Sequence, residues 1–430
     1  MPIELPSTAL LTDHYELTMV AAALRSGAAQ ARCVFEVFTR HLPPKRRYGV
    51  VAGTGRLLDA IERFRFGPDE LDDLRAHRVV DPDTVDWLAR YRFAGDVDGH
   101  AEGEVFFPDT PVLSVTGTFA DCVVLETLVL SVLNHDSAIA SAAARMVGAA
   151  GTRPVIEMGS RRTHELAAVA AARAAHLAGF ASTSNLEAGR RHGVPTAGTA
   201  AHAFVLAHPS EREAFEAQVA CLGAATTLLV DTFDVARGVR TAVDVAGPRL
   251  GAVRIDSGDL AALAFEVRAA LDSLGAFSTR IVVTGDLDEH AIAALSAAPV
   301  DSYGVGTSLV TGSGAPTAGF IYKLVERDGV PVEKTSVGKG TRGGHKSPAR
   351  RYAGATAIAD VIRVGLGAER GARAGNERML HVPLMRAGER TGDWSLAEAR
   401  EHCRASLAEL PREAMKLSAG PPALPTLFES

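Results

Sequence analysis

Short apolar segments alternate with stretches of helical periodicity between residues 153 and 304. Each apolar segment is only four to six residues long and leads into a turn, usually followed by a helix-like stretch. Parallel strands need a crossover between them, and a helix is the usual crossover. The pattern therefore predicts consecutive parallel βα units, with strands at 153–158, 179–183, 195–199, 227–230, 251–255, 280–284 and 301–304.

Seven such units favour a (β/α) barrel that is one unit short of eight, with an open doubly wound sheet as the alternative. The flanks differ from this middle part, because residues 1–115 mix strand-like pieces with helices and residues 321–430 contain turn-rich, basic stretches. Neither flank has an obvious linker to the middle, so the two are expected to pack together. We therefore predict a domain formed by 1–118 and 321–430, and a catalytic (β/α) quasi-barrel at 119–320.

Charge and cysteine content exclude several classes of protein. Lys and Arg number 45 and Asp and Glu number 51, so the net charge of −6 argues against a general binder of nucleic acid or anionic membranes. The four cysteines are far apart, which excludes a disulfide framework or a zinc finger. The N-terminus lacks the features of a secretory signal, and the apolar run 122–133 is interrupted by Glu126 and is too short to span a bilayer. We expect a soluble intracellular protein.

Polar residues follow directly after the predicted strands, which is where barrels place their active sites. These residues lie at 157–162, 183–185, 198–202, 231–234, 254–259, 284–286 and 304–308. The last group, GVGTS, is similar to a phosphate cradle, since glycines let backbone N–H groups approach an anion. In isolation a plain turn explains it about as well, but its place after the last predicted strand favours a phosphate site.

Charged side chains in the same groups suggest an anionic ligand. Arg161, Arg162 and Arg254 are suited to clamp a phosphate or carboxylate. The alternative is internal ion pairing with Asp256 or Glu157.

The aspartates of these groups suggest contacts to Mg²⁺ or ribose. Asp256, Asp259 and Asp286 are suited to either, although Asp259 is equally placed to cap the helix that starts at Leu260.

One histidine faces the same edge of the predicted barrel. His202 follows the third predicted strand, and Asp231 is placed to orient its imidazole. Most histidines in a chain have structural roles, so spacing alone only mildly favours catalysis here. No HExxH or comparable spacing is present, so we do not expect a catalytic zinc.

Taken together, these motifs resemble the nicotinate phosphoribosyltransferase family, of the actinobacterial type. The stretch TDHYELTM at 12–19 is similar to the family's N-terminal signature, and the groups at 157–162, 198–202, 254–259 and 304–307 match its internal motifs in order. A basic stretch is similar to the family's KxSxxK…GxK segment, through Lys334, Ser336, Lys339, Gly344 and Lys346. The resemblance runs from residue 10 to about residue 352.

The resemblance implies a type II phosphoribosyltransferase fold, with a quasi-barrel of seven βα units and an open-faced α+β domain made from both chain ends. It implies condensation of nicotinate with phosphoribosyl pyrophosphate (PRPP) to nicotinate mononucleotide and pyrophosphate, the entry step of NAD salvage. The reaction would be coupled to ATP hydrolysis, as in a ligase, and would use Mg²⁺. The resemblance further implies a cytoplasmic homodimer with shared active sites and no nucleic-acid or membrane partner.

The resemblance also assigns roles to individual residues. His202 is similar to the histidine that ATP phosphorylates, and Asp231 to the carboxylate that orients it. Contacts to nicotinate are implied for Tyr15 (from the neighbouring subunit), Thr199, Arg254, Ser184 and Arg161. PRPP contacts are implied for Asp256, Ser257, Gly285, Asp286, Gly304, Gly306 and Thr307, with Asp256 and Asp286 as Mg²⁺ contacts through PRPP or water.

One position bears on the choice between acid and amide substrates. Relatives specific for nicotinamide carry an aspartate at the place of Ser184, where a carboxylate would accept from an amide and repel nicotinate. Serine removes that repulsion, so nicotinate is expected. The alternatives are a related transferase for nicotinamide or quinolinate, and a non-catalytic nucleotide-binding paralogue. The presence of His202, Asp231, Arg254 and Asp256 argues against the paralogue.

Overall fold

The computed structural model describes residues 6–334, 342–365 and 375–429. The chain divides into two compact units, one formed by Met1–Ser141 and Ala315–Ser430 and the other by Ala142–Gly314. The first boundary between the two units falls inside the long helix α6 (Glu126–Ala150), whereas the sequence predicts it between residues 118 and 119. The reason is hydrophobic packing, because Leu128, Val129 and Leu133 of α6 belong to the core of the first unit.

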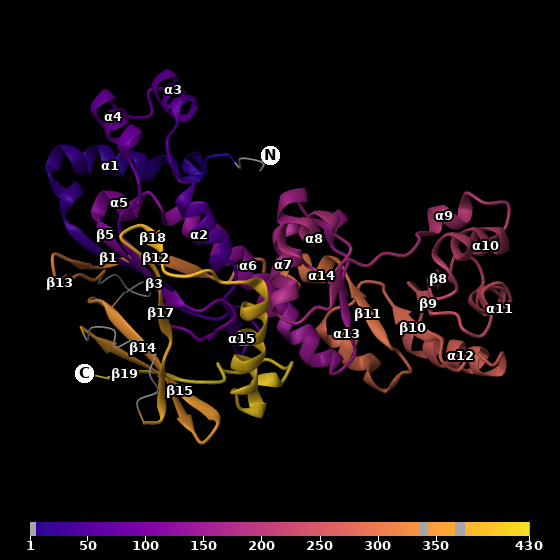
Figure 1. Cartoon of the computed structure of the whole chain (residues 1–430). Helices are drawn as coiled ribbons and strands as arrows, with labels where there is room; N and C mark the ends of the chain where they lie inside the picture. The colour runs from indigo at the N-terminus through magenta and orange to yellow at the C-terminus, as the bar shows by residue number, and fades with distance from the viewer. Residues whose placement is uncertain (1–5, 335–341, 366–374, 430) are drawn as a thin grey trace. The chain divides into compact units, whose positions relative to one another are not determined.

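The first unit is built around a sheet of seven strands to which both ends of the chain contribute, in the order β13-β12-β1-β5-β3-β17-β18 (Figure 1). The third strand in this order, β1 (Arg32–Thr39), pairs antiparallel with β12 (Phe320–Arg327) on one side and β5 (Leu113–Thr118) on the other. The remaining strands are β3 (Asp96–His100), β13 (Val330–Pro331), β17 (His381–Arg386) and β18 (Glu389–Arg390). This confirms the prediction that the two flanks build one domain.

Smaller sheets and helices complete the first unit. A sheet with the order β16-β14-β15-β19 and a two-stranded pair, β2-β4, are also present. Their bounds are β2 (Gly49–Val50), β4 (Val105–Phe106), β14 (Lys346–Ala353), β15 (Thr356–Val364), β16 (Glu377–Met379) and β19 (Thr426–Glu429). The helices are α1 (His14–Ser26), α2 (Thr54–Glu62), α3 (Pro68–Ala76), α4 (Pro82–Arg90), α5 (Phe119–Val123) and α15 (Leu396–Ala408).

Several aromatic side chains pack against one another in the core of the first unit. Phe35 of β1 stacks on Tyr322 of β12 with ring centroids 4.8 Å apart, and Phe106 lies 4.7 Å from Phe320. Such pairs add about 0.5–1.5 kcal/mol beyond the burial of their area. The hydroxyl of Tyr322 donates a 2.9 Å hydrogen bond to the carbonyl oxygen of Cys122, so its polar end is satisfied. These contacts join strands from the two chain ends.

The second unit is a parallel sheet with the order β7-β6-β11-β10-β9-β8. Its strands are β6 (Val155–Glu157), β7 (Ser182–Thr183), β8 (Thr227–Leu229), β9 (Ala252–Ile255), β10 (Arg280–Val283) and β11 (Ser302–Val305). The connecting helices are α7 (Glu165–Leu177), α8 (Leu186–His192), α9 (His202–Leu206), α10 (Glu211–Leu222), α11 (Val235–Ala246), α12 (Leu260–Ser273), α13 (Glu289–Ala294) and α14 (Thr307–Val310). The alternation of strand and helix predicted from the sequence is confirmed.

The strand order decides between the two closures that the sequence left open. The last strand, β11, pairs with the first, β6, through Tyr303 opposite Val155 and Gly304 opposite Ile156. From β6 the neighbours run to β7 on one side and back through β11, β10 and β9 to β8 on the other. The units therefore follow one another in cyclic order, as in a barrel that remains open between β7 and β8.

The predicted third strand at 195–199 is reduced to a single parallel bridge between Thr183 and Thr196, so the prediction of a full strand was wrong. Thr183 N donates to Pro195 O and Ala197 N donates to Thr183 O, each at 2.9 Å. The proline has no N–H to donate, and residues 195 and 196 are exposed, so no apolar face holds the segment in the sheet. The segment still occupies the third position of the cycle.

The helix at the start of the barrel is long and apolar. The stretch Phe119–Ala150, which includes α5 and α6, has the length and composition of a membrane span, but 67% of its most apolar window is buried inside the structure. The core helix of a soluble protein passes the same test, so this helix is weak evidence for a membrane. The four cysteines are free.

Candidate active site

The carboxyl ends of four neighbouring strands, β6, β9, β10 and β11, surround a cavity of about 200 Å³. Parallel strands bring the residues that follow them to one edge of a barrel. The cavity is lined by Met158, Arg161, Arg162, Arg254, Asp256, Thr284, Gly285, Asp286, Gly304, Gly306 and Thr307. Most of the residues that the sequence predicted as ligand contacts therefore meet in one place.

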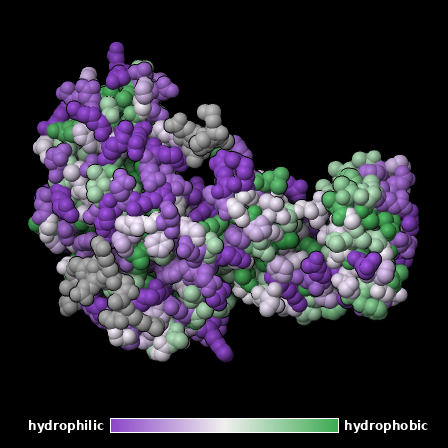
Figure 2. All heavy atoms as spheres, viewed as in Figure 1, coloured by the Kyte–Doolittle hydropathy of each residue, from purple (hydrophilic) through white to green (hydrophobic). Residues whose placement is uncertain are grey.

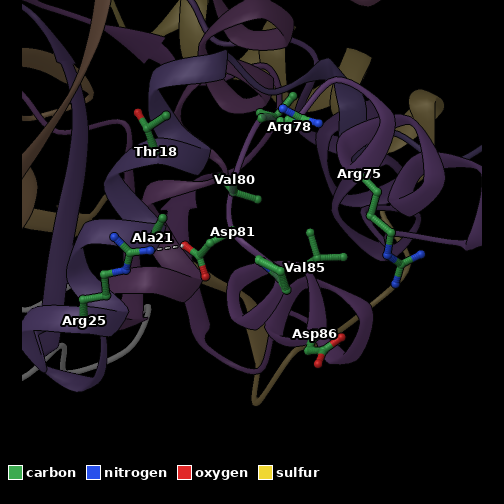
Figure 3. A pocket seen from close by; sticks show the side chains of 11 residues that line it. Thr18, Ala21, Arg25, Arg75, Arg78, Val80, Asp81, Val85 and Asp86 are labelled. Atoms are coloured by element: carbon green, nitrogen blue, oxygen red, sulfur yellow. Dashed lines mark ion pairs between the residues drawn. The ribbon is translucent and has the colours of Figure 1, made fainter.

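A larger cavity, of about 680 Å³, lies in the first unit between α1 and the segment that joins α3 to α4 (Figure 3). Its charged lining residues carry both signs, and Arg25 Nη2 lies 3.3 Å from Asp81 Oδ2 as an ion pair. None of the predicted site residues lines it. Size alone would select this cavity, whereas the chemistry of the lining residues selects the smaller one.

Two glycines allow the backbone to approach closely at the smaller cavity. Gly285 has φ +113°, and a Cβ there would overlap the carbonyl oxygen of Asp256. A Cβ at Gly304 would overlap Thr284 Cγ2. The next residue after Gly285, Asp286, is exposed and has φ +46°, an uncommon conformation for a residue with a side chain. Strained backbone of this kind is often found at ligand sites.

Arg254 reaches the cavity from the end of β9. Its Nη1 donates a 2.6 Å hydrogen bond to Thr199 Oγ1. Its Nε is buried and has no hydrogen-bond partner among the described residues. Burial lowers the pKa of Arg254, while the negative charges of Asp256 and Asp231 act in the opposite direction.

Arg161 and Arg162 lie in the turn that follows β6 and are exposed. The alternative of internal ion pairing with Glu157 is not realised, because Glu157 is fully buried and accepts hydrogen bonds from Thr183 Oγ1 and the backbone N–H of Gly159. Burial raises the pKa of Glu157. Within the described part of the chain, no ion pair joins either arginine to Glu157 or Asp256.

His202 begins α9, and a residue that the sequence reasoning missed contacts its ring. Its Nδ1 lies 3.1 Å from Thr232 Oγ1, which is hydrogen-bond distance. Its Nε2 lies 3.9 Å from Asp231 Oδ1 and 3.8 Å from Asp256 Oδ2, which is too long for hydrogen bonds. Thr232, the neighbour of Asp231 in the sequence, therefore makes the direct contact with the ring.

Asp231 instead holds the turn after β9. Its Oδ2 accepts hydrogen bonds from the backbone N–H of Asp256 (2.8 Å) and from Ser257 Oγ (2.9 Å). The Asp231 side chain is only 2% exposed, and its Oδ1 has no hydrogen-bond partner among the described residues.

The site offers few ligands to a metal ion. Asp256 Oδ1 accepts a 2.5 Å hydrogen bond from Thr284 Oγ1, and Asp286 is exposed at the cavity. No group of three or more His, Cys, Asp or Glu side chains suited to a metal ion occurs in the described part of the chain. This fits Mg²⁺, which is usually held by one or two carboxylates together with waters and substrate phosphates. Asp259 caps α12, since its Oδ1 accepts from Ala262 N at 3.1 Å.

Three predicted nicotinate contacts, Thr199, Ser184 and Tyr15, do not line the cavity, although Thr199 accepts the hydrogen bond from Arg254. Ser184 is exposed at the end of β7, in the same unit. Tyr15 belongs to α1 of the first unit and is 46% exposed. Its pKa is raised to about 12, mainly by burial and then by the nearby negative charge of Glu126, which also accepts its hydroxyl hydrogen bond.

The described residues of the N-terminal signature and of the basic stretch include two that have structural roles. Glu16, next to Tyr15 in the N-terminal signature, is buried and accepts hydrogen bonds from Thr12 and Thr127, so it has a structural role. Lys346 forms a buried ion pair with Glu36 at 2.7 Å. Ser336 and Lys339 lie outside the described residues.

Comparison with known proteins agrees with this geometry. Residues 10–134 match the nicotinate phosphoribosyltransferase (NAPRTase) N-terminal domain, and residues 154–341 match the nicotinate phosphoribosyltransferase (NAPRTase) family. The nicotinate phosphoribosyltransferase pncB1 of Mycobacterium tuberculosis is 59% identical over 425 residues, which cover 97% of this chain and 94% of that protein. That of Bacillus subtilis is 36% identical over 342 residues, which cover 77% and 70%.

Solved structures show the same fold. The crystal structure of human nicotinic acid phosphoribosyltransferase superposes with a TM-score of 0.84 at 26% identity, covering 97% of this chain and 98% of that one. The nicotinate-nucleotide pyrophosphorylase of Pyrococcus furiosus superposes with a TM-score of 0.77 at 26% identity, covering 94% and 95%. The fold and the site define a type II phosphoribosyltransferase. The chain belongs to the nicotinate phosphoribosyltransferase family, of the actinobacterial type, and is an enzyme of NAD biosynthesis.

Proposed function

We propose that the enzyme condenses nicotinate with PRPP to give nicotinate mononucleotide and pyrophosphate, and that ATP hydrolysis is coupled to this reaction through phosphorylation of His202. The observation that carries the proposal is the meeting of Arg254, the glycine-rich turns and two aspartates around one cavity at the carboxyl edge of the barrel. Such a site suits a ligand with several negative charges.

In the proposed reaction the pyridine nitrogen of nicotinate attacks C1 of the ribose, and the bond from C1 to the pyrophosphate oxygen breaks. The nitrogen is neutral and carries no proton, so it needs positioning rather than a base. We assign the nicotinate carboxylate to Arg254 and Thr199, which already hydrogen bond to each other. We assign an adjacent contact to the exposed Arg161.

We assign PRPP to the turns that follow β9, β10 and β11. The 5′-phosphate would lie against Gly304, Gly306 and Thr307, where a close backbone approach is possible. The ribose hydroxyls would meet Asp256, Ser257 and Asp286, with Gly285 allowing the turn. Arginines beside the cavity would stabilise the charge that develops on the leaving pyrophosphate.

Mg²⁺ would be held by Asp256 and Asp286 together with PRPP oxygens or waters. When bound, the ion would neutralise negative charge on the pyrophosphate. The chain's own aspartates then have the task of holding PRPP in one orientation.

The proposed ATP coupling runs through His202. A ring nitrogen accepts the γ-phosphoryl group of ATP, releasing ADP, and the phosphohistidine is later hydrolysed to phosphate and free histidine. The support is that His202 is 39% exposed beside two carboxylates and is held by Thr232, so that its ring is both accessible and oriented. We assign to Asp231 the stabilisation of the charged ring.

We also propose that the enzyme is a cytoplasmic homodimer whose sites are shared, with Tyr15 reaching the partner's nicotinate. Exposed apolar side chains support an interface on the second unit. Phe204, Leu206 and Leu222 are between 36% and 63% exposed, and Figure 2 shows hydrophobic surface over α9 and α10. An exposed apolar patch of this kind is typical of a contact surface. Nucleic acid and membranes are not among the partners we propose.

The test is formation of a mononucleotide from PRPP, Mg²⁺ and ATP with nicotinate, nicotinamide or quinolinate, each product being identified by mass spectrometry. We expect product from nicotinate at a rate far above that from the other two bases, because Ser184 leaves no carboxylate to repel it. Product mainly from nicotinamide or quinolinate would instead identify the enzyme as a phosphoribosyltransferase for that base. PRPP binding without turnover of any base would indicate a non-catalytic paralogue.

A further inference from the structure

Two consecutive residues after β8 hold two different parts of the candidate active site. Thr232 Oγ1 contacts His202 Nδ1 at 3.1 Å. Asp231 Oδ2 accepts hydrogen bonds from the backbone N–H of Asp256 at 2.8 Å and from Ser257 Oγ at 2.9 Å. A single peptide unit therefore joins the imidazole to the turn after β9.

The sheet fixes the position of this peptide unit. Val230 N, just before it, donates a 3.2 Å hydrogen bond to Arg254 O, so the ends of β8 and β9 are tied together. Because Asp231 and Thr232 are adjacent at the end of a paired strand, neither can shift without moving the other. A displacement of the His202 ring would reach the Asp256–Ser257 turn through them.

The free oxygen of Asp231 faces the same ring. Asp231 Oδ1 is buried, has no hydrogen-bond partner within the described part of the chain, and lies 3.9 Å from His202 Nε2. Buried polar atoms almost always find a partner. A small movement of the exposed imidazole would bring an Nε2–H within hydrogen-bond distance of Oδ1. Asp231 can therefore bind the His202 ring through Oδ1 while Oδ2 holds the turn after β9.

We propose that Asp231 and Thr232 act as positioning residues that link His202 to the Asp256–Ser257 turn, so that the reaction with ATP at the ring depends on PRPP at the turn. This inference rests on the proposed function, which places ATP chemistry at His202 and PRPP at the turn. It adds that the link runs through two side-chain contacts, Thr232 to the ring and Ser257 to Asp231. Coupling between two ligands is a free energy shared by their sites.

The test measures the ADP released per mononucleotide formed, since this ratio rises when ATP hydrolysis proceeds without product. Thr232→Val removes the hydroxyl and keeps the shape, and Ser257→Ala removes the other contact. Thr232→Ser restores the first hydroxyl. Matched controls are Thr241→Val and Ser273→Ala, whose hydroxyls donate only to carbonyl oxygens of their own helices, at 3.0 and 2.8 Å.

We expect the ratio to rise roughly two- to tenfold in Thr232→Val and in Ser257→Ala, the range given by the loss of one hydrogen bond. Thr232→Ser and both controls should remain close to the wild-type ratio. In the double variant the ratio should rise more than in either single variant. The rise should be smaller than the product of the two single rises, because both contacts lie on one link. A purely structural role would lower the melting temperature and leave the ratio unchanged.

The outcomes separate this inference from the proposed function. A wild-type enzyme that makes the mononucleotide with ATP hydrolysis, together with unchanged ratios in both single variants, overturns the inference alone. A wild type that makes the mononucleotide without consuming ATP overturns the coupling part of the proposed function, and the inference with it. If Thr232→Val fails to fold, Thr232→Ala removes the same hydroxyl without adding a methyl group and decides instead. Ser257→Ala counts as a test of the link only where KM for PRPP is unchanged, because Ser257 is also assigned to PRPP.

Discussion

Arg254 Nη1 donates a 2.6 Å hydrogen bond to Thr199 Oγ1 and thereby joins the end of β9 to the segment that precedes α9. The two residues are 55 positions apart in the sequence. Burial lowers the pKa of Arg254, and the negative charges of Asp256 and Asp231 oppose this shift. Its buried Nε, which has no partner among the described residues, remains for a ligand.

Replacing Arg254 by lysine tests the assignment of the nicotinate carboxylate. Lysine keeps the positive charge but lacks the planar fork that binds a carboxylate with two donors. We expect KM for nicotinate to rise roughly 10- to 100-fold, because the loss of one charged hydrogen bond costs about 1.5–3 kcal/mol. KM for PRPP should change less. The exposed Arg249 provides the control, and Arg249→Lys should have no effect. Equal increases in both KM values for Arg254→Lys would contradict the assignment.

Ser184 should decide between the acid and the amide. Ser184→Asp introduces a carboxylate that repels the nicotinate carboxylate and accepts from the amide of nicotinamide. We expect kcat/KM for nicotinate to fall at least about tenfold and that for nicotinamide to rise, because like charges placed together cost several kcal/mol. Ser184→Ala, which removes the hydroxyl without adding charge, should change the preference little. A Ser184→Asp variant that keeps the wild-type preference would show that this position does not face the base.

Gly285 should not tolerate a side chain. Its φ of +113° and the nearby Asp256 carbonyl oxygen predict that Gly285→Ala lowers the free energy of unfolding by about 1–3 kcal/mol and weakens PRPP binding. Gly148, in the last turn of α6, has no atom within 4 Å of the place that a Cβ would occupy, so Gly148→Ala should raise stability by up to about 1 kcal/mol. Urea unfolding and PRPP titration measure both. Wild-type PRPP affinity in Gly285→Ala would remove this turn from the PRPP site.

Acid should destabilise the first unit through His381. Burial lowers the pKa of this histidine from 6.5 to about 4, while its Nε2 contacts Pro111 O at 2.8 Å. Between those pH values the unfolded chain binds a proton that the folded chain does not, so stability falls as the pH falls. The loss attributable to His381 should reach about 3 kcal/mol.

His381→Gln, which keeps a donor for Pro111 O, tests this directly. Denaturant unfolding at pH 7 and pH 4 should show a smaller loss of stability in this variant than in the wild type. The exposed His290 is the control, and His290→Gln should follow the wild type. A His381→Gln variant that loses as much stability as the wild type would exclude this histidine as the cause.

The sequence predicted the barrel well because its signal is local. Short apolar segments identified six strands of the sheet, and the cyclic pairing of β11 with β6 agrees with the predicted closure. The segment 195–199 was predicted as a strand because it is one of the short segments that alternate with helical stretches, but Pro195 and the exposure of its neighbour prevent a ladder. Edge position and exposure depend on the whole sheet, so the segment alone could not show them.

The candidate site was predictable in its composition but not in its contacts. The residues around the cavity follow strands, so a pattern of polar residues after apolar segments found them. The contact between Thr232 and His202 depends on the orientation of two turns 30 residues apart, and a threonine beside a conspicuous aspartate carried no signal of its own. The only available hint was its position in the group at 231–234.

The most direct measurement is mononucleotide formation from nicotinate, PRPP and Mg²⁺, with and without ATP, by the wild type and by His202→Ala. His208→Ala is the control, because His208 lies just after α9 and its Nδ1 contacts only Phe204 O, at 2.8 Å. We predict that ATP stimulates the wild type and His208→Ala, and that His202→Ala is slower and gains nothing from ATP. Equal stimulation of His202→Ala by ATP would contradict the account.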